Sequence, residues 1–205
     1  MKKLILFDVD GVLFNSIQNM ELSWNEVMKK FLIKKEFNQY KRYIGLPFKK
    51  ILYKLNIKNN QSSIENYYQK KSLEYLHKIK PYPNVLKKIR NYDSKRFLIG
   101  IWTSKHRLRV NKILKKYNLK FDFIIAPKKG IRGKPHPDQV TKCLKSLNIL
   151  NKNVFFVGDM KTDREAAKKS KINFIFASYG FGKIKDKKLN RLSNFKDVYK
   201  IVERL

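Results

Sequence analysis

The chain is poor in cysteine and in acidic residues, and it has no long hydrophobic run. Among its 205 residues is one cysteine, Cys143, so no disulfide forms within the chain and a reducing compartment is expected. No apolar stretch approaches the length of a membrane span. Asp8 interrupts the first apolar stretch too early for the core of a signal peptide. These absences predict a soluble, cytoplasmic protein with no membrane partner.

The scarcity of acid leaves a large positive charge. Only 16 Asp and Glu face 48 Lys and Arg, a formal net charge of +32. One interpretation is a polyanion partner such as nucleic acid; the other is a composition bias spread over all solvated faces. The basic residues are scattered, lysine outnumbers arginine, and no basic cluster alternates with aromatic residues that would stack on bases. Specific nucleic-acid binding is therefore not favoured.

The hydrophobic residues, 42% of the chain, are sufficient for a folded core. Short apolar runs predict strands at 4–7, 98–103, 121–126, 154–158 and 172–177, and helical patterns fall between the later ones. Alternating strands and helices indicate an α/β fold with a Rossmann-like parallel sheet. The strands are almost continuously apolar, as expected when helices cover both faces of the sheet.

One long helical stretch interrupts this alternation. Apolar residues recur at three- and four-residue steps from Ile17 to Phe31, and helical patterns continue around Ile51–Leu55 and Ile64–Leu76. A stretch from 15 to 80 is too long for a connector. We therefore expect a core made of 1–14 and 81–205, with 15–80 inserted as a helical subdomain.

Two carboxylates follow the first predicted strand, in the sequence Asp8-Val9-Asp10-Gly11. Residues two apart on an extended segment point to the same side, so the carboxylates converge. A calcium loop is excluded, because its first and last ligand positions would be Leu6 and Ile17. A plain Asp-Gly turn and a metal or phosphate site both remain open on this stretch alone.

Three later segments offer matching chemistry. Thr103 and Ser104 lie between a strand and a helix, where hydroxyls and free N–H groups suit a phosphate, although an ordinary helix cap explains them equally. Lys134 precedes Pro135 in a proline-fixed loop and is either a phosphoryl-neutralising cation or a solvated lysine. Asp159 follows the strand at 154–158, and a metal ligand is the better account of it.

The last segment also carries a capping pattern. Thr162 and Glu165 have the spacing of a capping box, and Asp163 in the first turn suits the helix dipole. We therefore expect a helix beginning at Thr162. Capping leaves Asp159 unexplained.

The order of these motifs resembles the haloacid dehalogenase superfamily of phosphohydrolases. The resemblance rests on Asp8-x-Asp10-Gly, Thr103-Ser104, Lys134-Pro135 and Gly158-Asp159-x-x-x-Asp163, which together span residues 4 to about 180. The helical insert resembles the cap of the phosphoglycolate phosphatase/β-phosphoglucomutase branch. One departure is Ser170-Lys171, where many members have Ala-Gly.

The resemblance implies a Mg²⁺-dependent phosphatase. Asp8 is then the nucleophile that forms an aspartyl-phosphate, and Asp10 protonates the leaving oxygen and later activates water. Mg²⁺ would be held by Asp8, the main-chain carbonyl of Asp10 and Asp159, with Asp163 as ligand or anchor. Charge on the transferring phosphoryl group would be stabilised by Thr103, Ser104 and Lys134.

The expected substrate is a small phosphorylated metabolite, either phosphoglycolate-like or a sugar phosphate, bound by a monomer or homodimer. Substrate choice is expected in the segment of the cap from Arg42 to Lys50, which we call the cap loop, with Arg42, Gly45 and Lys49 as candidates. The alternatives are a sugar phosphomutase and, less favoured, a protein that binds polyanions or acts on nucleic-acid ends.

Overall fold

The computed structural model describes residues 2–205 and contains one large parallel sheet. Its strands are β1 (Lys3–Phe7), β4 (Phe97–Trp102), β5 (Phe123–Ile125), β6 (Val154–Gly158), β7 (Asn173–Ala177) and β8 (Asn190–Leu192). They lie in the order β5-β4-β1-β6-β7-β8, and every neighbouring pair is parallel. The predicted α/β fold with a parallel sheet is confirmed.

Helices cover both faces of this sheet, as the apolar strands require. Ile5 and Phe7 of β1 join one buried cluster, and Leu4 and Leu6 join the other. Residues of α5, α6 and α9 complete the first cluster, and residues of α7 and α8 the second. The bounds are α5 (Val85–Arg90), α6 (Arg107–Lys116), α7 (Asp138–Leu147), α8 (Lys161–Lys169) and α9 (Val198–Arg204), with short 3₁₀ turns η2 (Asn151–Asn153) and η3 (Phe195–Asp197).

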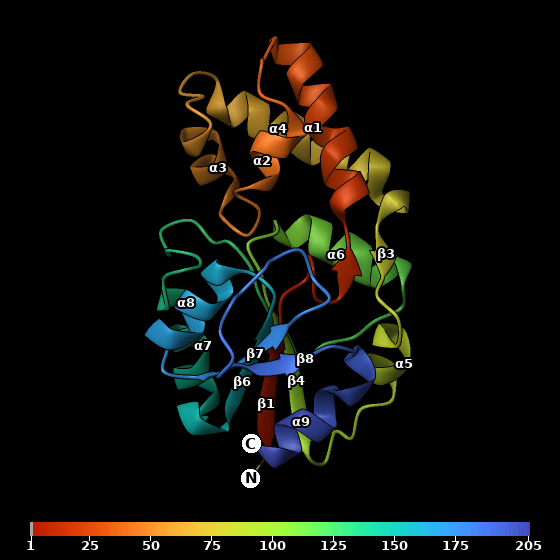
Figure 1. Cartoon of the computed structure of the whole chain (residues 1–205), viewed down its shortest axis with the longest axis vertical. Coiled ribbons are helices and arrows are strands. Elements are labelled where there is room, and N and C mark those ends of the chain that lie inside the picture. Colours follow the sequence, from red (N-terminus) through yellow and green to blue (C-terminus); the bar gives the residue numbers. More distant parts are fainter. Residues whose placement is uncertain (1) are drawn as a thin grey trace.

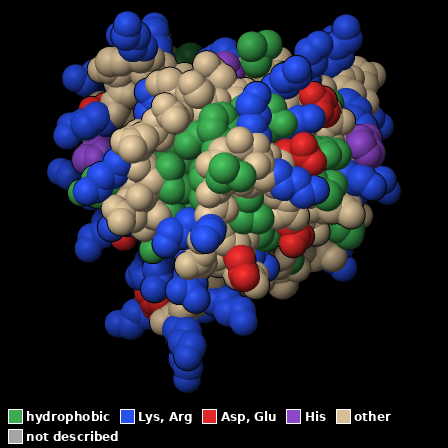
Figure 2. Space-filling view, turned by 90° about the horizontal axis from the view of Figure 1, so that it is seen from above, with side chains coloured by type: hydrophobic (Ala, Val, Ile, Leu, Met, Phe, Trp, Pro, Cys, Tyr) green, Lys and Arg blue, Asp and Glu red, His purple; other side chains and the backbone are tan. Residues whose placement is uncertain are grey.

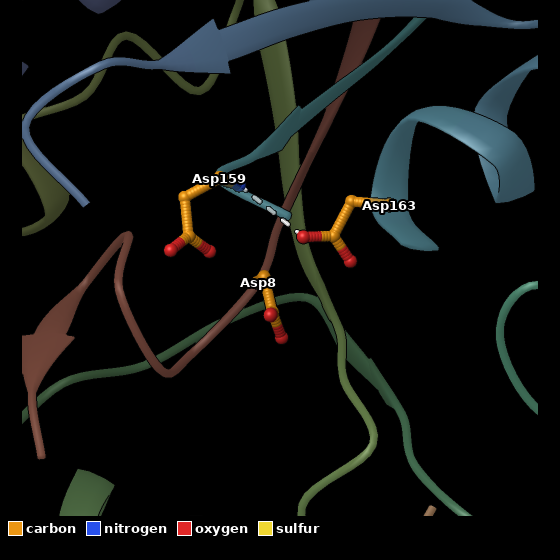
Figure 3. A group of neighbouring side chains, drawn as sticks. All are labelled: Asp8, Asp159 and Asp163. Carbon is orange, nitrogen blue, oxygen red and sulfur yellow. Dashed lines mark hydrogen bonds between the residues drawn. The ribbon is translucent and has the colours of Figure 1, made fainter. Parts of the chain in front are cut away.

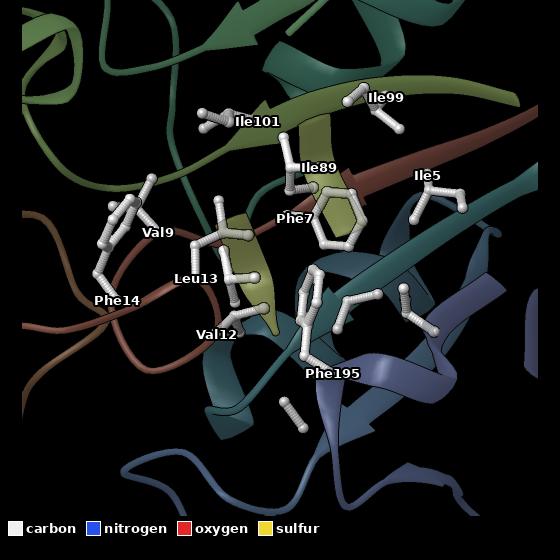
Figure 4. Packing of buried hydrophobic residues seen from close by; sticks show 14 of the residues in the cluster. Ile5, Phe7, Val9, Val12, Leu13, Phe14, Ile89, Ile99, Ile101 and Phe195 are labelled. Carbon is white, nitrogen blue, oxygen red and sulfur yellow. The ribbon is translucent and has the colours of Figure 1, made fainter. Parts of the chain in front are cut away.

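The packing of β1 against its first face is dense. Figure 4 shows Phe7 beside Phe195, with ring centroids 5.5 Å apart, and Ile89 of α5 nearby. All three side chains are almost completely buried. Burial of this kind fixes β1 at the centre of the sheet, and so fixes the position of the carboxylates that follow it.

A group of helices forms the other end of the molecule (Figure 1). It comprises α1 (Ile17–Phe31), α2 (Phe37–Lys41), α3 (Phe48–Lys54), α4 (Gln61–Glu74) and the 3₁₀ turn η1 (Tyr75–Lys78). These helices surround their own buried cluster, in which Trp24, Tyr40 and Tyr68 are the largest side chains. We call residues 15–80 the cap.

Two short strands connect the cap to the sheet region. β2 (Phe14–Asn15) pairs antiparallel with β3 (Lys80–Pro81). The helical subdomain predicted over 15–80 therefore has a strand residue at each end, and these two, Asn15 and Lys80, pair with each other. A two-residue strand is too short to leave a periodic pattern in the sequence.

Other differences from the predicted elements are small. The strand β8 has no counterpart among the predicted strands, because two of its three residues are exposed and its apolar signal is weak. β5 covers only the middle of the predicted strand 121–126. None of the described helices is both long and apolar enough to cross a bilayer.

Positive charge surrounds the cap end of the molecule. Figure 2 shows the face at the cap end, where Lys and Arg side chains surround a more hydrophobic centre and do not gather in one patch. On this face the basic side chains are scattered, as they are along the sequence.

Candidate active site

The polar residues named from the sequence meet at the carboxyl edge of the parallel sheet. Asp8 follows β1, Thr103 follows β4, and Asp159 follows β6. All three are at least 96% buried. Since β1 pairs with both β4 and β6 in parallel, the chain directions alone bring these three strand ends together.

Three carboxylates form a compact cluster at this edge. Ligand oxygens of Asp8, Asp159 and Asp163 all lie within 4.8 Å of one another. Figure 3 shows Asp8 and Asp159 at the ends of their strands and Asp163 on α8, with the three carboxylates around a common space. Carboxylate oxygens of this number are suitable ligands for a hard divalent cation.

Asp163 is held at the start of α8 by backbone donors. Its Oδ2 accepts hydrogen bonds from the N–H groups of Asp159 (3.2 Å) and Met160 (3.0 Å). The predicted capping box of Thr162 and Glu165 is wrong, because α8 begins one residue earlier and Asp163 occupies the N3 position. The Oγ1 atom of Thr162 is buried without a hydrogen-bond partner.

One carboxylate oxygen of Asp159 accepts hydrogen bonds, and the other has no hydrogen-bond partner. Its Oδ2 accepts from the N–H groups of Phe181 (2.7 Å) and Gly182 (3.3 Å), whereas its Oδ1 is buried with no partner. Burial raises the pKa of Asp159 well above its usual value, and the nearby carboxylates of Asp163 and Asp8 raise it further. A cation bound at Oδ1 would remove both penalties, so the residues present fit a metal site.

Gly11 explains the glycine in the first motif. It has a φ of +85°, and a Cβ atom at this position would lie 2.2 Å from Oδ2 of Asp159. Only glycine allows the backbone after Asp10 to pass so close to that carboxylate.

Asp8 shares its surroundings with Lys134. Burial raises the pKa of Asp8 to about 7, although the ammonium group of Lys134 opposes the shift. Lys134 is 1% exposed, and its Nζ lies 3.2 Å from Asp8 Oδ1 and 2.6 Å from Asp163 Oδ1. Burial alone would lower the pKa of Lys134, but the carboxylates of Asp163 and Asp8 raise it above its ordinary value. Lys134 is therefore not a solvated lysine.

Asp10 lies beside the cluster and is oriented separately. Its Oδ1 accepts a hydrogen bond from the Ser16 hydroxyl and lies 3.0 Å from Nζ of Lys105. Its side chain is 14% exposed. Ser16 directly follows the strand β2, so Asp10 contacts the connection between core and cap.

Thr103 and Ser104 are not the caps of α6, since the side chain of His106 caps that helix. The Oγ1 of Thr103 accepts from the N–H of Lys105 (3.1 Å). The hydroxyl of Ser104 donates to the carbonyl of Gly45 in the cap loop (3.0 Å). This hydrogen bond holds the cap loop against the core.

A cavity of about 50 Å³ lies where the cap meets the cluster. Asp8, Asp10, Thr103 and Ser104 line it from the core. The residues contributed by the cap are Met20, Tyr40, Ile44, Gly45, Leu46, Phe48, Ile51 and Tyr68. A volume of this size admits a small polar ligand or a few waters.

The candidate cap residues are placed unequally. Gly45 lines the cavity, whereas Arg42 and Lys49 are exposed and are not among its lining residues. Lys105 and Arg109 line it instead, and both are buried. The sequence analysis gave neither a role, because two cations four residues apart carry no signal in a chain with 48 Lys and Arg.

Known proteins share both the sequence pattern and the fold. The family model described as "Haloacid dehalogenase-like hydrolase" matches residues 5–177. A phosphoglycolate phosphatase from Aquifex aeolicus is 28% identical over 189 residues, which cover 89% of this chain and 87% of that protein. A pyrophosphatase PpaX from Anoxybacillus flavithermus is 29% identical over 171 residues, covering 80% and 78%.

Solved structures agree at the level of the fold. The crystal structure of a hydrolase from Pseudomonas syringae superposes with a TM-score of 0.86 at 20% identity, covering 100% of this chain and 99% of that one. The family match includes residues 5–7 of β1, the whole cap and the segments carrying the three clustered aspartates. The chain therefore belongs to the haloacid dehalogenase-like hydrolase family, as the order of its motifs indicated.

Proposed function

We propose that this protein is a Mg²⁺-dependent phosphatase of small phosphorylated metabolites. The observation that carries the proposal is the buried cluster of Asp8, Asp159 and Asp163, in which Oδ1 of Asp159 has no partner and Lys134 bridges two carboxylates. The relatives named phosphoglycolate phosphatase and pyrophosphatase support the substrate class.

Asp8 is the proposed nucleophile. Its carboxylate attacks phosphorus, the bond to the leaving oxygen breaks, and an aspartyl-phosphate forms. Asp10 gives its proton to the leaving oxygen and then accepts one from the water that hydrolyses the intermediate, which returns Asp8 to its carboxylate form. The contacts of Asp10 with Ser16 and Lys105 hold it beside Asp8 for this task.

The remaining site residues are proposed to hold the phosphoryl group and the metal. Thr103, Ser104 and Lys134 stabilise the charge on the transferring group. Mg²⁺ would be held by Asp8, the carbonyl of Asp10, Asp159 and Asp163, and would neutralise phosphate charge.

The cap, residues 15–80, is proposed to be a separate subdomain that closes over the cavity. Its own buried cluster and its connection through β2 and β3 support this division. Closure would exclude water while the phosphoryl group is transferred.

The test measures phosphate release from a panel of phosphorylated metabolites and an aryl phosphate, with Mg²⁺ or with EDTA. Wild type is compared with Asp8→Asn and with Glu21→Gln, a control that removes an exposed carboxylate of α1. We expect release that needs Mg²⁺, falls at least about a thousandfold in Asp8→Asn and persists in the control.

Two results would contradict this proposal. Folded wild type that releases no phosphate from any compound is not a phosphatase of this class. Isomerisation of a sugar phosphate that depends on a bisphosphate, without net release, would identify a mutase instead.

A further inference from the structure

Arg109 is a buried cation without a carboxylate partner. Arg109 lies on α6 and is 7% exposed. Its Nη1 donates to Oγ of Ser72 on α4 (2.9 Å), and its guanidinium lies over the ring of Tyr68, 5.3 Å from the centroid. Its Nε is buried with no hydrogen-bond partner, and within residues 2–205 no carboxylate oxygen lies within 4.0 Å of it. A buried guanidinium in this state lacks its counter-charge.

Lys105 lines the same cavity as Arg109, and it is also buried with few negative partners. Its side chain is 1% exposed, and its one ion pair within residues 2–205 joins it to Asp10, at 3.0 Å. Asp10 also lies against Ser16, and it is the residue that we assign to proton transfer. Lys105 and Arg109 therefore bring two positive charges to a cavity whose carboxylates, Asp10 and Asp8, are already paired with Lys105 and Lys134. Arg109 is left without a counter-charge.

The cap does not supply the missing negative charge. Its contribution to the cavity consists of apolar side chains, Gly45 and the hydroxyls of Tyr40 and Tyr68, which lie 3.1 Å from each other. No Asp or Glu of the cap lines the cavity, among the residues that the structure describes. The counter-charge must then come from what binds there.

The reacting phosphoryl group does not account for Arg109. Asp8, Thr103 and Lys134 already surround the place that we assign to it, and Lys134 is engaged with Asp8 and Asp163. Asp8 and Arg109 line the same cavity of about 50 Å³, so a small ligand held by Asp8 can also reach Arg109.

We propose that Arg109, assisted by Lys105, binds a second anionic group of the substrate. This inference rests on the proposed phosphatase function and narrows its substrates to small compounds with a carboxylate or second phosphoryl group close to the scissile phosphate. Arginine suits either group because its planar fork donates two parallel hydrogen bonds. The two relatives described above are named for phosphoglycolate and pyrophosphate, compounds that carry a second anionic group of this kind.

The test compares three phosphates that differ in this second group. The probes are 2-phosphoglycolate, with a carboxylate, pyrophosphate, with a second phosphoryl group, and ethyl phosphate, with neither. We expect wild type to prefer one of the first two over ethyl phosphate in kcat/KM, and Arg109→Gln to reduce that preference roughly 30-fold or more. Which of the two anionic probes is preferred identifies the second group.

Two matched variants separate charge recognition from structure. Lys112→Gln removes an exposed cation from the same helix and should leave the preference unchanged. Ser72→Ala removes the hydrogen bond of Arg109 to α4 but keeps the guanidinium and its contact with the Tyr68 ring, so the preference should stay within about threefold of wild type. Equal losses on all three probes in Arg109→Gln would mean that Arg109 only fastens the cap, which would overturn the proposal.

Binding to the inactive Asp8→Asn protein keeps this test independent of turnover. Calorimetry in the presence of Mg²⁺ should give a tighter Kd for 2-phosphoglycolate or pyrophosphate than for ethyl phosphate, and adding Arg109→Gln should abolish the difference. If this result appears while wild type hydrolyses nothing, the anion site stands and the phosphatase function fails. Equal affinity for all three probes in a protein that is an active phosphatase refutes the anion site alone.

Discussion

The sheet edge and the cap differ sharply in what they bury. Among the described residues, every buried charged side chain lies outside the cap: Asp8, Lys105, Arg109, Lys134, Asp159 and Asp163. The buried polar residues of the cap are neutral, namely Ser16, Asn19, Ser23 and Ser72, and its cluster is rich in aromatic rings. Burying a charge without a partner costs free energy, so a cluster of buried charges indicates a place where a charged ligand can offset that cost.

This difference assigns separate tasks to the two regions. The core holds the groups that we propose to react with or neutralise phosphate, and it also holds both cations that line the cavity. The cap shapes and encloses that cavity with rings, hydroxyls and the backbone of Gly45. The cations that line the cavity therefore come from the core, whereas Arg42 and Lys49 of the cap do not line it.

The largest expected effect tests the charged region. Asp159→Asn keeps the size of the side chain but replaces a carboxylate oxygen with an amide, so a bound cation loses a charged ligand. We expect phosphate release to fall about a thousandfold and the Mg²⁺ concentration for half-maximal activity to rise. Asp197→Asn, on a partly exposed carboxylate before α9, is the control. An unchanged Mg²⁺ requirement in Asp159→Asn would remove Asp159 from the metal site.

The second prediction uses the pKa of Asp8, which burial raises to about 7 from an ordinary value of 3.8. The folded protein therefore keeps a proton on Asp8 at pH values where the unfolded chain has released it. By linkage, this group stabilises the fold below about pH 4, and the stabilisation is lost as the pH rises to about 7.

Asp8→Asn cannot ionise and so escapes this loss. In EDTA at about pH 8 we expect its Tm to exceed that of wild type by roughly 5 °C, with the difference shrinking toward pH 5. Mg²⁺ should narrow the gap at pH 8, because it stabilises the wild-type carboxylate. A Tm difference that does not vary with pH would show that Asp8 is not the group responsible.

The third prediction concerns the contact between the two regions. Gly45 has a φ of +95°, and a Cβ atom there would lie 2.8 Å from Oγ1 of Thr162. Gly45→Ala should therefore push the cap loop away from Ser104 and lower kcat/KM about tenfold. Adding Thr162→Ala removes the clashing oxygen and should restore part of the loss; no restoration would place the effect in backbone strain alone.

The sequence predicted the sheet edge better than the cavity, for a physical reason. Asp8 and Asp159 follow continuous apolar strands, and parallel pairing forces such strand ends together. Asp163 was predicted from its spacing to Asp159, but the capping box was assigned to Thr162 and Glu165. In the structure Asp163 itself accepts hydrogen bonds from the N–H groups of Asp159 and Met160. The predicted start of α8 was therefore one residue too late.

The cavity depends on tertiary packing that no local pattern encodes. Arg109 faces the cavity because α6 packs against α4 of the cap, two helices that are distant in the sequence. Arg42 follows α2 and Lys49 lies on α3; both are exposed, and neither lines the cavity. In a chain with so many cations, the sequence does not distinguish the two that line the cavity, because their burial arises only in the folded structure.

The smallest expected effect concerns α8, the helix that carries Asp163. Lys171, just after this helix, has a φ of +53°, in the left-handed region, where many members of the superfamily have glycine. Lys171→Gly should relieve this strain and raise the free energy of unfolding by about 0.5–1 kcal/mol, measured by urea denaturation. Phosphate release should stay as in wild type, because Lys171 is exposed and lines no part of the cavity. A gain in stability without a change in activity would show that backbone strain in the core is separable from the buried charges at its edge; a change in activity would show that the end of α8 adjusts the position of Asp163.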